Sequence, residues 1–429
     1  MPRRLRTFGG GLLLIAFAAL GVRIAFALAV APDVRALPPT DAGAYHLLAN
    51  NLADGRGYIR PYDRLLAKPP VVRPTAEYPP LFPALLSLVS RAGGTSVNAQ
   101  RLAMCFVGAG TVVLIGLLGR RVTNAAVGLL AAGLAAVYPM LFQSDAVLMP
   151  ETLYAFLVAA TLLLAYQAAA KPSAARYVAL GFAVGAAALT RAEALLLVPL
   201  LVVPLAGALR ALAPRRRLAL GATAVGAVVL VVLPWTIRNY VRFDALVPVS
   251  TNASFIFDGA NCPETFSGPL RGTWRYSDEC FEGLLQSELA AGNEATAAAS
   301  HRDDGLDYAR DHLDDVPVVM AVRWLRTFGV YDAKRQVEFE ALEWRRPRWQ
   351  TLGMRMYWAL LPFAAVGTVV LVRRRLRVWP LLSTFALVSL TTVLTYGNQR
   401  FRIAAEPALL VLAATGMLAL ARRGRVAAT

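Results

Sequence analysis

The residues in this sequence that are best suited to chemistry are carboxylates and arginines at the edges of long apolar runs. A carboxylate can take a proton from a reacting hydroxyl group, and an arginine can bind two phosphate oxygens at once. Charged groups at membrane depth are costly, so they usually face a cavity or a partner. Each of them could instead be an ordinary interfacial anchor. The candidates are Asp41, Asp145, Glu151, Arg191, Glu193, Arg238, Asn239, Arg400 and Arg402.

The apolar runs that flank these residues predict an integral membrane protein. The chain has 429 residues, of which 57% are hydrophobic and 17% are charged, whereas soluble domains have about 25% charged residues. The runs are long enough to cross a hydrocarbon core about 30 Å thick. We therefore expect an all-α polytopic membrane protein, with no interrupted spans. About ten helices are predicted, at residues 9–31, 99–119, 125–142, 150–170, 176–190, 193–210, 218–235, 353–372, 378–396 and 404–420.

The positive charge predicts the orientation of these spans. The chain carries a formal charge of +17, and its basic clusters fall at alternate connections between spans. Such clusters remain on the cytoplasmic side of membranes, so both termini are predicted to be cytoplasmic and the candidate residues extracytoplasmic. The sequence has no basic strip with interleaved aromatic residues, which is the pattern that would indicate nucleic-acid binding. The clusters are Arg3, Arg4 and Arg6; Arg120 and Arg121; Lys171 and Arg176; Arg215, Arg216 and Arg217; Arg373, Arg374 and Arg375; and Arg422, Arg423 and Arg425.

Two long polar segments divide the chain. An N-terminal transmembrane core at 1–235 includes a first extracytoplasmic loop at 32–98, a large capping loop follows at 236–352, and C-terminal helices occupy 353–429. Helical spacing of leucines after Asp41 predicts a short surface helix, for which Asp41 could be the N-cap. Cys262 and Cys280 both lie in the capping loop. A disulfide between them is plausible if that loop is extracytoplasmic.

Short motifs in a fixed order resemble one enzyme family. They read TDAGAYHLLANNLADGRGY, EYPPLFPALLSL, PETLYAFL, ALTRAEALLLVP, LPWTIRNYVRFDALVPVSTN and YGNQRFRIAAEPALL. Together they resemble glycosyltransferase family 39, the bacterial relatives of protein O-mannosyltransferases and lipid A aminoarabinose transferases. The resemblance implies a GT-C fold and a cell (inner) membrane enzyme. Such an enzyme moves a sugar from a polyprenyl phosphate to a hydroxyl of an envelope glycan, lipid or protein.

The resemblance also implies roles for the acidic residues. The catalytic Asp of the first loop matches Asp41, which we predict to be a general base in an inverting displacement. The second acidic position matches Glu151, with Asp145 as the alternative. Relatives often have a second acidic residue next to the catalytic Asp, but Ala42 stands there in this sequence. That departure leaves an inactive relative as one alternative.

The remaining candidates are predicted to bind substrate. Arg238, Arg400 and Arg402 suit a departing lipid phosphate, with Arg191 behind them, although Arg191 could simply pair with Glu193. Tyr45 lies four residues after Asp41, on the same helix face, where it could orient Asp41, stack on a sugar or anchor at the interface. The predicted substrate-binding set is Tyr45, Asp145, Arg191, Glu193, Arg238, Asn239, Arg400 and Arg402.

No organic cofactor and no metal site are predicted. The stretch HRDDGLDYARDHLDD could hold a cation, but we favour a solvated helix. The sequence has no nucleotide-binding phosphate loop. A transporter or flippase of lipid-linked sugars is the main rival function, because it would also place charges in a cavity. The absence of any visible inverted repeat or broken helix argues against that rival.

Overall fold

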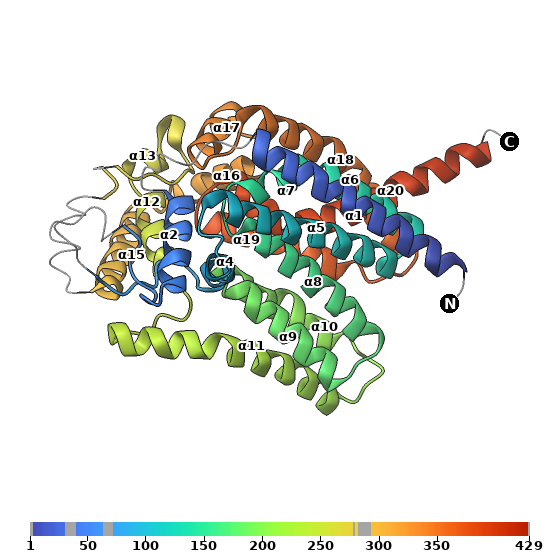
Figure 1. Ribbon diagram of the computed structural model, residues 1–429, viewed down its shortest axis with the longest axis horizontal. Coiled ribbons are helices and arrows are strands. Elements are labelled where there is room, and N and C mark those ends of the chain that lie inside the picture. The colour runs from blue at the N-terminus through green and yellow to red at the C-terminus, as the bar shows by residue number, and fades with distance from the viewer. Residues whose placement is uncertain (1–2, 31–39, 63–71, 278, 282–292, 428–429) are drawn as a thin grey trace.

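The computed structural model describes residues 3–30, 40–62, 72–277, 279–281 and 293–427. Within these ranges the chain folds almost entirely into helices (Figure 1), and the β-structure is limited to one antiparallel bridge between Ile59 and Pro74. The predicted all-α fold is therefore confirmed. Of the basic clusters, the side chains of Arg3, Arg4, Arg6, Arg423 and Arg425 lie outside the described part.

Helices in the described residues match the predicted spans. Five of them are long and apolar enough to cross a membrane, and a sixth candidate is a bent pair. The five are α1 (Arg3–Ala29), α5 (Val97–Val122), α8 (Glu151–Ala170), α11 (Pro214–Phe243) and α18 (Pro347–Arg373). Shorter apolar helices occupy the remaining predicted spans. They are α9 (Ala174–Ala188), α10 (Val203–Gly207) and α19 (Trp379–Leu394), and the last predicted span lies on the longer helix α20 (Glu406–Ala427).

Two of the predicted spans are broken, contrary to our expectation of uninterrupted helices. One breaks between α6 (Ala125–Val137) and the helical turns from Pro139, with a bend of 56°. Tyr138 is extended there because a residue before proline avoids the α conformation. The other runs from η2 (Ala192–Leu196) through a π-helical turn, η3 (Val198–Val202), into α10. Pro199 and Pro204 lack the amide hydrogens that a regular helix needs.

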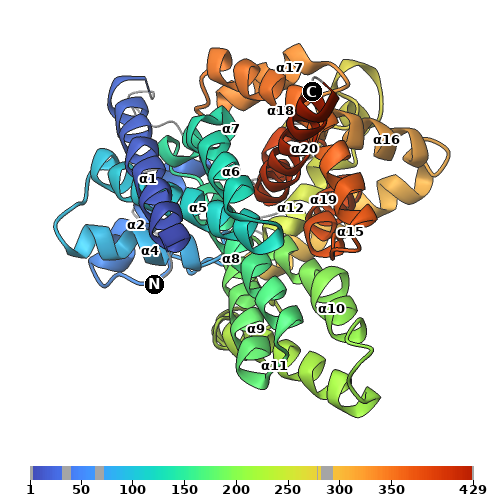
Figure 2. The ribbon, with the colours of Figure 1, turned by 90° about the vertical axis from the view of Figure 1, so that its right-hand side faces the viewer.

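Glycines allow close packing within the bundle. A Cβ on Gly181 of α9 would overlap the backbone of Ala224 in α11, and one on Gly416 of α20 would overlap Phe363 of α18. Close approach of this kind is typical of small residues at membrane helix interfaces. Viewed end-on, α9, α10 and α11 group apart from α18, α19 and α20, with α8 toward the middle (Figure 2).

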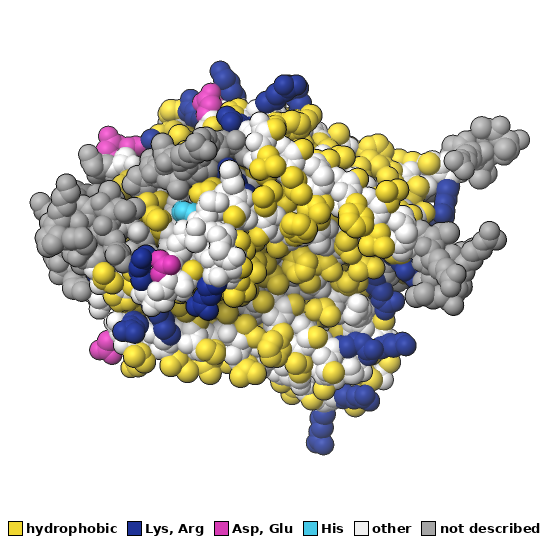
Figure 3. Space-filling model, in the orientation of Figure 1, with side chains coloured by type: hydrophobic (Ala, Val, Ile, Leu, Met, Phe, Trp, Pro, Cys, Tyr) yellow, Lys and Arg dark blue, Asp and Glu magenta, His cyan; other side chains and the backbone are white. Residues whose placement is uncertain are grey.

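Helices of the two long loops lie at one end of the molecule. Figure 1 places α2, α12 and α15 at the end opposite the start of α1 and the end of α20. Between the two ends, hydrophobic side chains cover the visible face (Figure 3). Lys and Arg side chains lie at both ends, whereas Asp and Glu are seen only toward the end that holds α2 and α15. This distribution is that of an integral membrane protein. The helices of the two long loops are α2 (Asp41–Ala53), α4 (Leu81–Arg91), α12 (Asn252–Ala260), α13 (Pro263–Phe266), α15 (Glu294–Asp311), α16 (Val316–Thr327) and α17 (Ala333–Leu342).

Candidate active site

Asp41 begins α2, but it does not cap the helix. Thr40 is the N-cap, and its hydroxyl accepts a hydrogen bond from the Gly43 amide at 3.3 Å. The Asp41 carboxylate is free to face the site instead. It accepts a hydrogen bond of 3.0 Å from the Tyr78 hydroxyl, and its side chain is 31% exposed. Asp41 is therefore held in one orientation while part of it remains open to a ligand.

Arg400 lies among three carboxylates from distant segments. It sits on η5 (Gln399–Ala404), the turn before α20. Its Nη1 lies 3.6 Å from Asp41 Oδ2 and 3.4 Å from Glu343 Oε1, and its Nε lies 3.9 Å from Glu151 Oε1. Its Nη2 donates to the Tyr396 hydroxyl at 3.2 Å. The fold thus brings the first loop, the start of α8 and the segment before α20 to one point.

Arg191 forms the second cationic centre of the site. It donates to Glu151 Oε1 at 2.7 Å and to Glu193 Oε1 at 2.5 Å, and its guanidinium lies 5.2 Å from the ring centre of Phe401. The pairing with Glu193 that the sequence left open is present. Glu151 is fully buried and contacts both arginines. It therefore positions the two cations relative to each other.

Two cavities meet at Asp41 and Arg400. The first, here called the aromatic cavity, measures about 280 Å³ and is lined by Phe255, Trp274, Tyr276 and Phe281 together with Glu77 and Glu343. The second, the apolar cavity, measures about 270 Å³ and is lined by aliphatic residues that include Met149, Leu196 and Leu394, together with Glu151, Arg191 and Glu193. Asp41, Asn252, Ile256, Tyr396 and Arg400 line both.

Tyr78 orients Asp41, a role that the sequence offered to Tyr45. The Tyr45 ring lines the apolar cavity and packs edge-to-face on Tyr78, with ring centres 4.8 Å apart, and on Phe82 at 5.1 Å. Burial, followed by the charges of Asp41 and Glu77, raises the pKa of Tyr78 well above its usual value. Its hydroxyl therefore stays protonated and can donate to Asp41.

Asp145 does not reach either cavity. It is buried beside Arg23, whose Nε lies 2.8 Å from Asp145 Oδ2, and it accepts a hydrogen bond of 2.8 Å from Thr152. Arg23 also donates to the backbone carbonyls of Ala135 and Ala136. The two charges neutralise each other inside the bundle. Glu151, and not Asp145, is the acidic residue of this segment that faces the site.

Two residues of the predicted substrate-binding set, Arg238 and Asn239, also lie elsewhere. Arg238 donates to the backbone carbonyls of Thr75 at 2.6 Å and Tyr58 at 2.9 Å, which ties the first loop to α11. Asn239 donates to the carbonyl of Val247 at 3.0 Å and is fully buried. Neither lines the aromatic or the apolar cavity.

Arg402 points away from Arg400. Its guanidinium lies 3.9 Å from the ring centre of Tyr357, and its Nε is 3.6 Å from Glu406 Oε1. Residues two apart on a 3₁₀ helix, which has three residues per turn, cannot face the same side. Only one of the two arginines in NQRFR can therefore serve the site, and it is Arg400.

Two carboxylates that the sequence did not single out line the aromatic cavity. Burial raises the pKa of Glu77 to about 8, helped by the negative charges of Glu294 and Asp41. Burial likewise raises the pKa of Glu343 to about 7, against the opposing charge of Arg400. Glu77 stands in the quoted EYPP motif, so its segment carried a signal. Nothing in the sequence around Glu343 distinguishes it from other surface glutamates.

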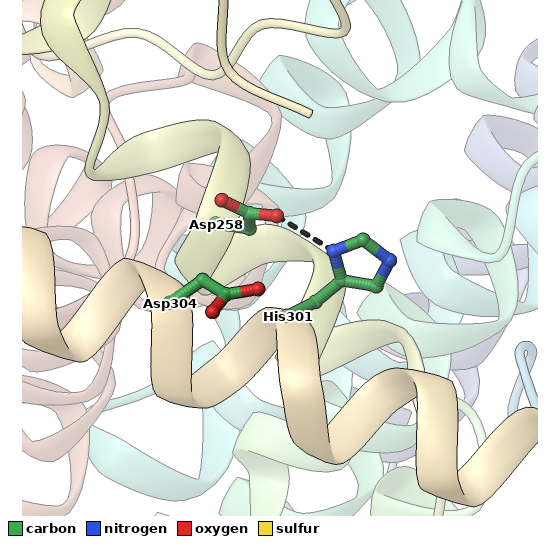
Figure 4. A group of neighbouring side chains, drawn as sticks. All are labelled: Asp258, His301 and Asp304. Atoms are coloured by element: carbon green, nitrogen blue, oxygen red, sulfur yellow. Dashed lines mark hydrogen bonds and ion pairs between the residues drawn. The ribbon is translucent and has the colours of Figure 1, made fainter. Parts of the chain in front are cut away.

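The stretch at 301–315 lies on α15 as far as Asp311 and then in the turn after it, so the favoured helix is present, although His301 is buried and not solvated. His301 Nδ1 lies 2.6 Å from Asp258 Oδ2 of α12, and Asp304 lies beside them on α15 (Figure 4). The ring of His301 packs against Phe255 and Phe281, with centres 4.9 and 5.6 Å away. These three polar groups could ligate a cation by type. In the structure, the His301–Asp258 pair joins α15 to α12 behind the aromatic cavity.

Fold and site together describe an α-helical membrane protein whose charged centre lies between two cavities. Residues 77–235 match the family model described as dolichyl-phosphate-mannose-protein mannosyltransferase. A comparison with curated proteins finds no match. Solved structures with a similar fold include the apo oligosaccharyltransferase of Archaeoglobus fulgidus, with a TM-score of 0.56 at 15% identity. The alignment covers 97% of this chain and 51% of that one, so the chain spans about half the length of this relative.

A second structure of the A. fulgidus oligosaccharyltransferase, AglB, holds an inhibitory peptide and a dolichol-phosphate. It aligns with a TM-score of 0.54 at 16% identity, over 99% of this chain and 51% of that one. ArnT from Cupriavidus metallidurans bound to undecaprenyl phosphate aligns at 17% identity with a TM-score of 0.43, over 97% of this chain and 78% of that one. The chain thus has the GT-C fold, as its motifs predict.

Proposed function

We propose that this protein is a membrane glycosyltransferase that moves a sugar from a polyprenyl-phosphate donor to an acceptor hydroxyl. The observation that carries the proposal is the meeting of Asp41 and Arg400, 3.6 Å apart, where two separate cavities join. A donor and an acceptor could approach this point from different sides. A base and a cation for the leaving group would then stand at the reacting atoms.

The apolar cavity suits the donor. Its aliphatic lining fits the first isoprene units of a lipid, and Arg191 and Arg400 stand at its charged end. Within the described residues, Arg400 Nε and Nη1 are buried and make no hydrogen bond, only ion-pair contacts of 3.4–3.9 Å. Buried donors without hydrogen bonds are costly. Phosphate oxygens would satisfy them.

The transfer itself is a single displacement. The acceptor oxygen attacks the anomeric carbon and its proton passes to Asp41, which Tyr78 holds in place. The bond between the anomeric carbon and the phosphate oxygen breaks, and the phosphate leaves with the electron pair. Arg400 stabilises that developing charge, with Arg191 behind it. The configuration at the anomeric carbon inverts, and no organic cofactor or metal is required by these steps.

We assign the site to the extracytoplasmic face of the cell membrane, with both termini cytoplasmic. Two observations support this orientation. At the end opposite the site, the charged side chains in view are Lys and Arg, whereas Asp and Glu appear only toward the end that carries the site (Figure 3), which agrees with the positive-inside pattern. Cys262 and Cys280 form a disulfide beside the aromatic cavity, and disulfides persist in oxidising compartments.

The direct test is transfer by the purified full-length protein. It would be incubated with labelled polyprenyl-phosphate sugars and membrane acceptors, and the product compared with that of Asp41→Asn. Loss of a general base should lower the rate roughly 10²–10⁴-fold. Asp54→Asn, the same change at the exposed far end of α2, is the matched control and should leave the rate unchanged. Near-normal turnover by Asp41→Asn would contradict the role of Asp41.

A transporter or flippase of lipid-linked sugars is the second candidate. The broken span from η2 to α10 favours it, because discontinuous helices often line transport sites. This span carries Arg191 and Glu193 into the apolar cavity. Movement of a labelled lipid-linked sugar across proteoliposomes, without transfer to any acceptor, would support this function over the first.

A further inference from the structure

The aromatic cavity has a continuous wall of rings. The half-buried ring of Trp274 lies 6.4 Å from that of Tyr276 and 6.2 Å from that of Phe281, and its indole nitrogen donates to the Phe255 carbonyl at 3.2 Å. The side chain of Tyr276 is 65% exposed. The wall therefore runs inward from an open mouth, and Trp274 is fixed within it.

This wall leads to the reacting centre. The ring of Trp274 lies 6.4 Å from that of Tyr396, whose hydroxyl accepts the hydrogen bond from Arg400. Arg400 in turn lies 3.6 Å from Asp41. A ligand lying on the rings would therefore have one end beside the proposed base.

A disulfide and a close glycine contact hold the wall in place. The disulfide between Cys262 and Cys280 closes the segment that carries Trp274, and both sulfurs pack in a cluster with Phe281. Gly259 is required behind the wall, since a Cβ there would lie 2.5 Å from the indole nitrogen of Trp274. A crosslink and a glycine of α12 thus fix the position of the rings.

The remaining lining is polar and hydrogen-bonding. Glu77, Glu343 and Asn252 face the same space as the rings. Flat rings and planar polar groups together match the surface of a sugar. A pyranose has an apolar face of C–H groups that fits the negative face of an aromatic ring, and its hydroxyls bond to carboxylates and amides at the rim. At about 280 Å³ the cavity far exceeds the roughly 10–15 Å³ that one water needs.

We propose that the aromatic cavity is the acceptor site and that it takes a carbohydrate. A pyranose ring of the acceptor stacks on Trp274, and one of its hydroxyls points at Asp41. This inference rests on the proposed function for the transfer step, while binding of the sugar does not depend on it.

Binding can be measured apart from transfer. Fluorophore-labelled neutral tetrasaccharides of glucose, mannose and N-acetylglucosamine would be titrated into the full-length protein in nanodiscs. Serine- and threonine-containing hexapeptides would be titrated in parallel. We expect at least one saccharide to bind and Trp274→Ala to weaken it about tenfold or more, since both burial and ring stacking are lost. Trp324→Ala, on α16 outside both cavities, should leave the affinity unchanged.

The outcomes separate this inference from the function beneath it. Saccharide binding that depends on Trp274, without transfer from any lipid donor, would retain the carbohydrate site and reject the transferase. Transfer to the peptides, with no saccharide bound, would retain the transferase and overturn the carbohydrate acceptor. Binding of no saccharide in the panel, or equal binding by Trp274→Ala, would overturn it as well. In an active protein, Trp274→Ala should raise the acceptor KM and leave the donor KM unchanged.

Discussion

Arg400 is the cation on which the proposed reaction depends most, and replacing it gives the sharpest test. A unit charge about 4 Å from a phosphate is worth about 4 kcal/mol at an effective dielectric constant near 20. Loss of one preorganised donor usually lowers a rate by roughly 10²–10³, which agrees with that energy. Arg400→Gln should therefore lower kcat by about that factor. Arg400→Lys, which retains the charge but not the planar fork, should lose roughly tenfold.

The same helix offers a matched control. Arg402 is two residues further on and is buried against Tyr357 and Glu406, outside both cavities. Arg402→Lys makes the same substitution as Arg400→Lys at a position where no substrate is expected. It should lower the melting temperature, because a buried pair is disturbed, while kcat stays within about threefold of wild type.

The assay is the initial rate of sugar transfer from a polyprenyl-phosphate donor, measured over a range of donor concentrations. The proposed mechanism places the Arg400 contribution in the departure of the phosphate, so kcat should fall more than the donor KM rises. A kcat for Arg400→Gln within tenfold of wild type would refute the reasoning. So would an equal fall in kcat for Arg400→Lys and Arg402→Lys, since the effect would then come from the fold.

Three further predictions follow from groups around the site. The pKa of Glu343 is about 7, so the donor KM should rise up to about tenfold between pH 6 and 8 as its carboxylate competes for Arg400; Glu343→Gln should flatten that profile. Glu77 has a folded pKa of about 8, above the unfolded value, so its ionisation destabilises the fold as pH rises from about 4.5 to 8. Glu77→Gln should therefore raise the melting temperature at pH 8.5 and not at pH 4.5, and an equal change at both would contradict this. Replacing Cys262 and Cys280 by serine opens a loop with a sequence separation of 18 and should lower the free energy of unfolding by about 3 kcal/mol. The replacement should also weaken saccharide binding, while donor binding measured in the same preparation persists.

Hydropathy predicted the helices well and their irregularities poorly. Each predicted span corresponds to a helical segment because run length and apolarity are properties of the sequence alone. The bend at Pro139 and the broken segment around Pro199 and Pro204 lie inside unbroken apolar runs. The prolines that cause them were visible. Their effect was not, because membrane helices often tolerate proline when neighbours satisfy the freed carbonyls.

The sequence likewise predicted part of the candidate site and missed the rest. Motifs singled out Asp41, Glu151, Arg191 and Arg400, and the structure joins them through contacts between distant segments. Depth does not give side-chain direction. For that reason Arg402 was included with Arg400, although the 3₁₀ turn sends it to the opposite side.

Arg238 was misread for a different reason. A charged residue at the outer end of α11 looks like a phosphate ligand in the sequence, but its guanidinium is used by backbone carbonyls of the first loop. That contact still serves the site. It ties both Tyr58 and Thr75 to α11, and Thr75 lies two residues before Glu77. Arginines that position a loop and arginines that bind a ligand cannot be told apart before the fold is known.

The two arginines at the centre differ in how firmly the protein holds them, and this difference assigns their roles. Arg191 donates short hydrogen bonds to Glu151 and Glu193, so its charge is already matched at close range. Arg400 shares three carboxylates, none closer than 3.4 Å, and two of its buried nitrogens make no hydrogen bond within the described residues. An incoming phosphate can therefore bind Arg400 without breaking a short hydrogen bond to a carboxylate. Arg191 would have to give up its partners, and so we assign it to holding Glu151 in place while Arg400 meets the leaving group.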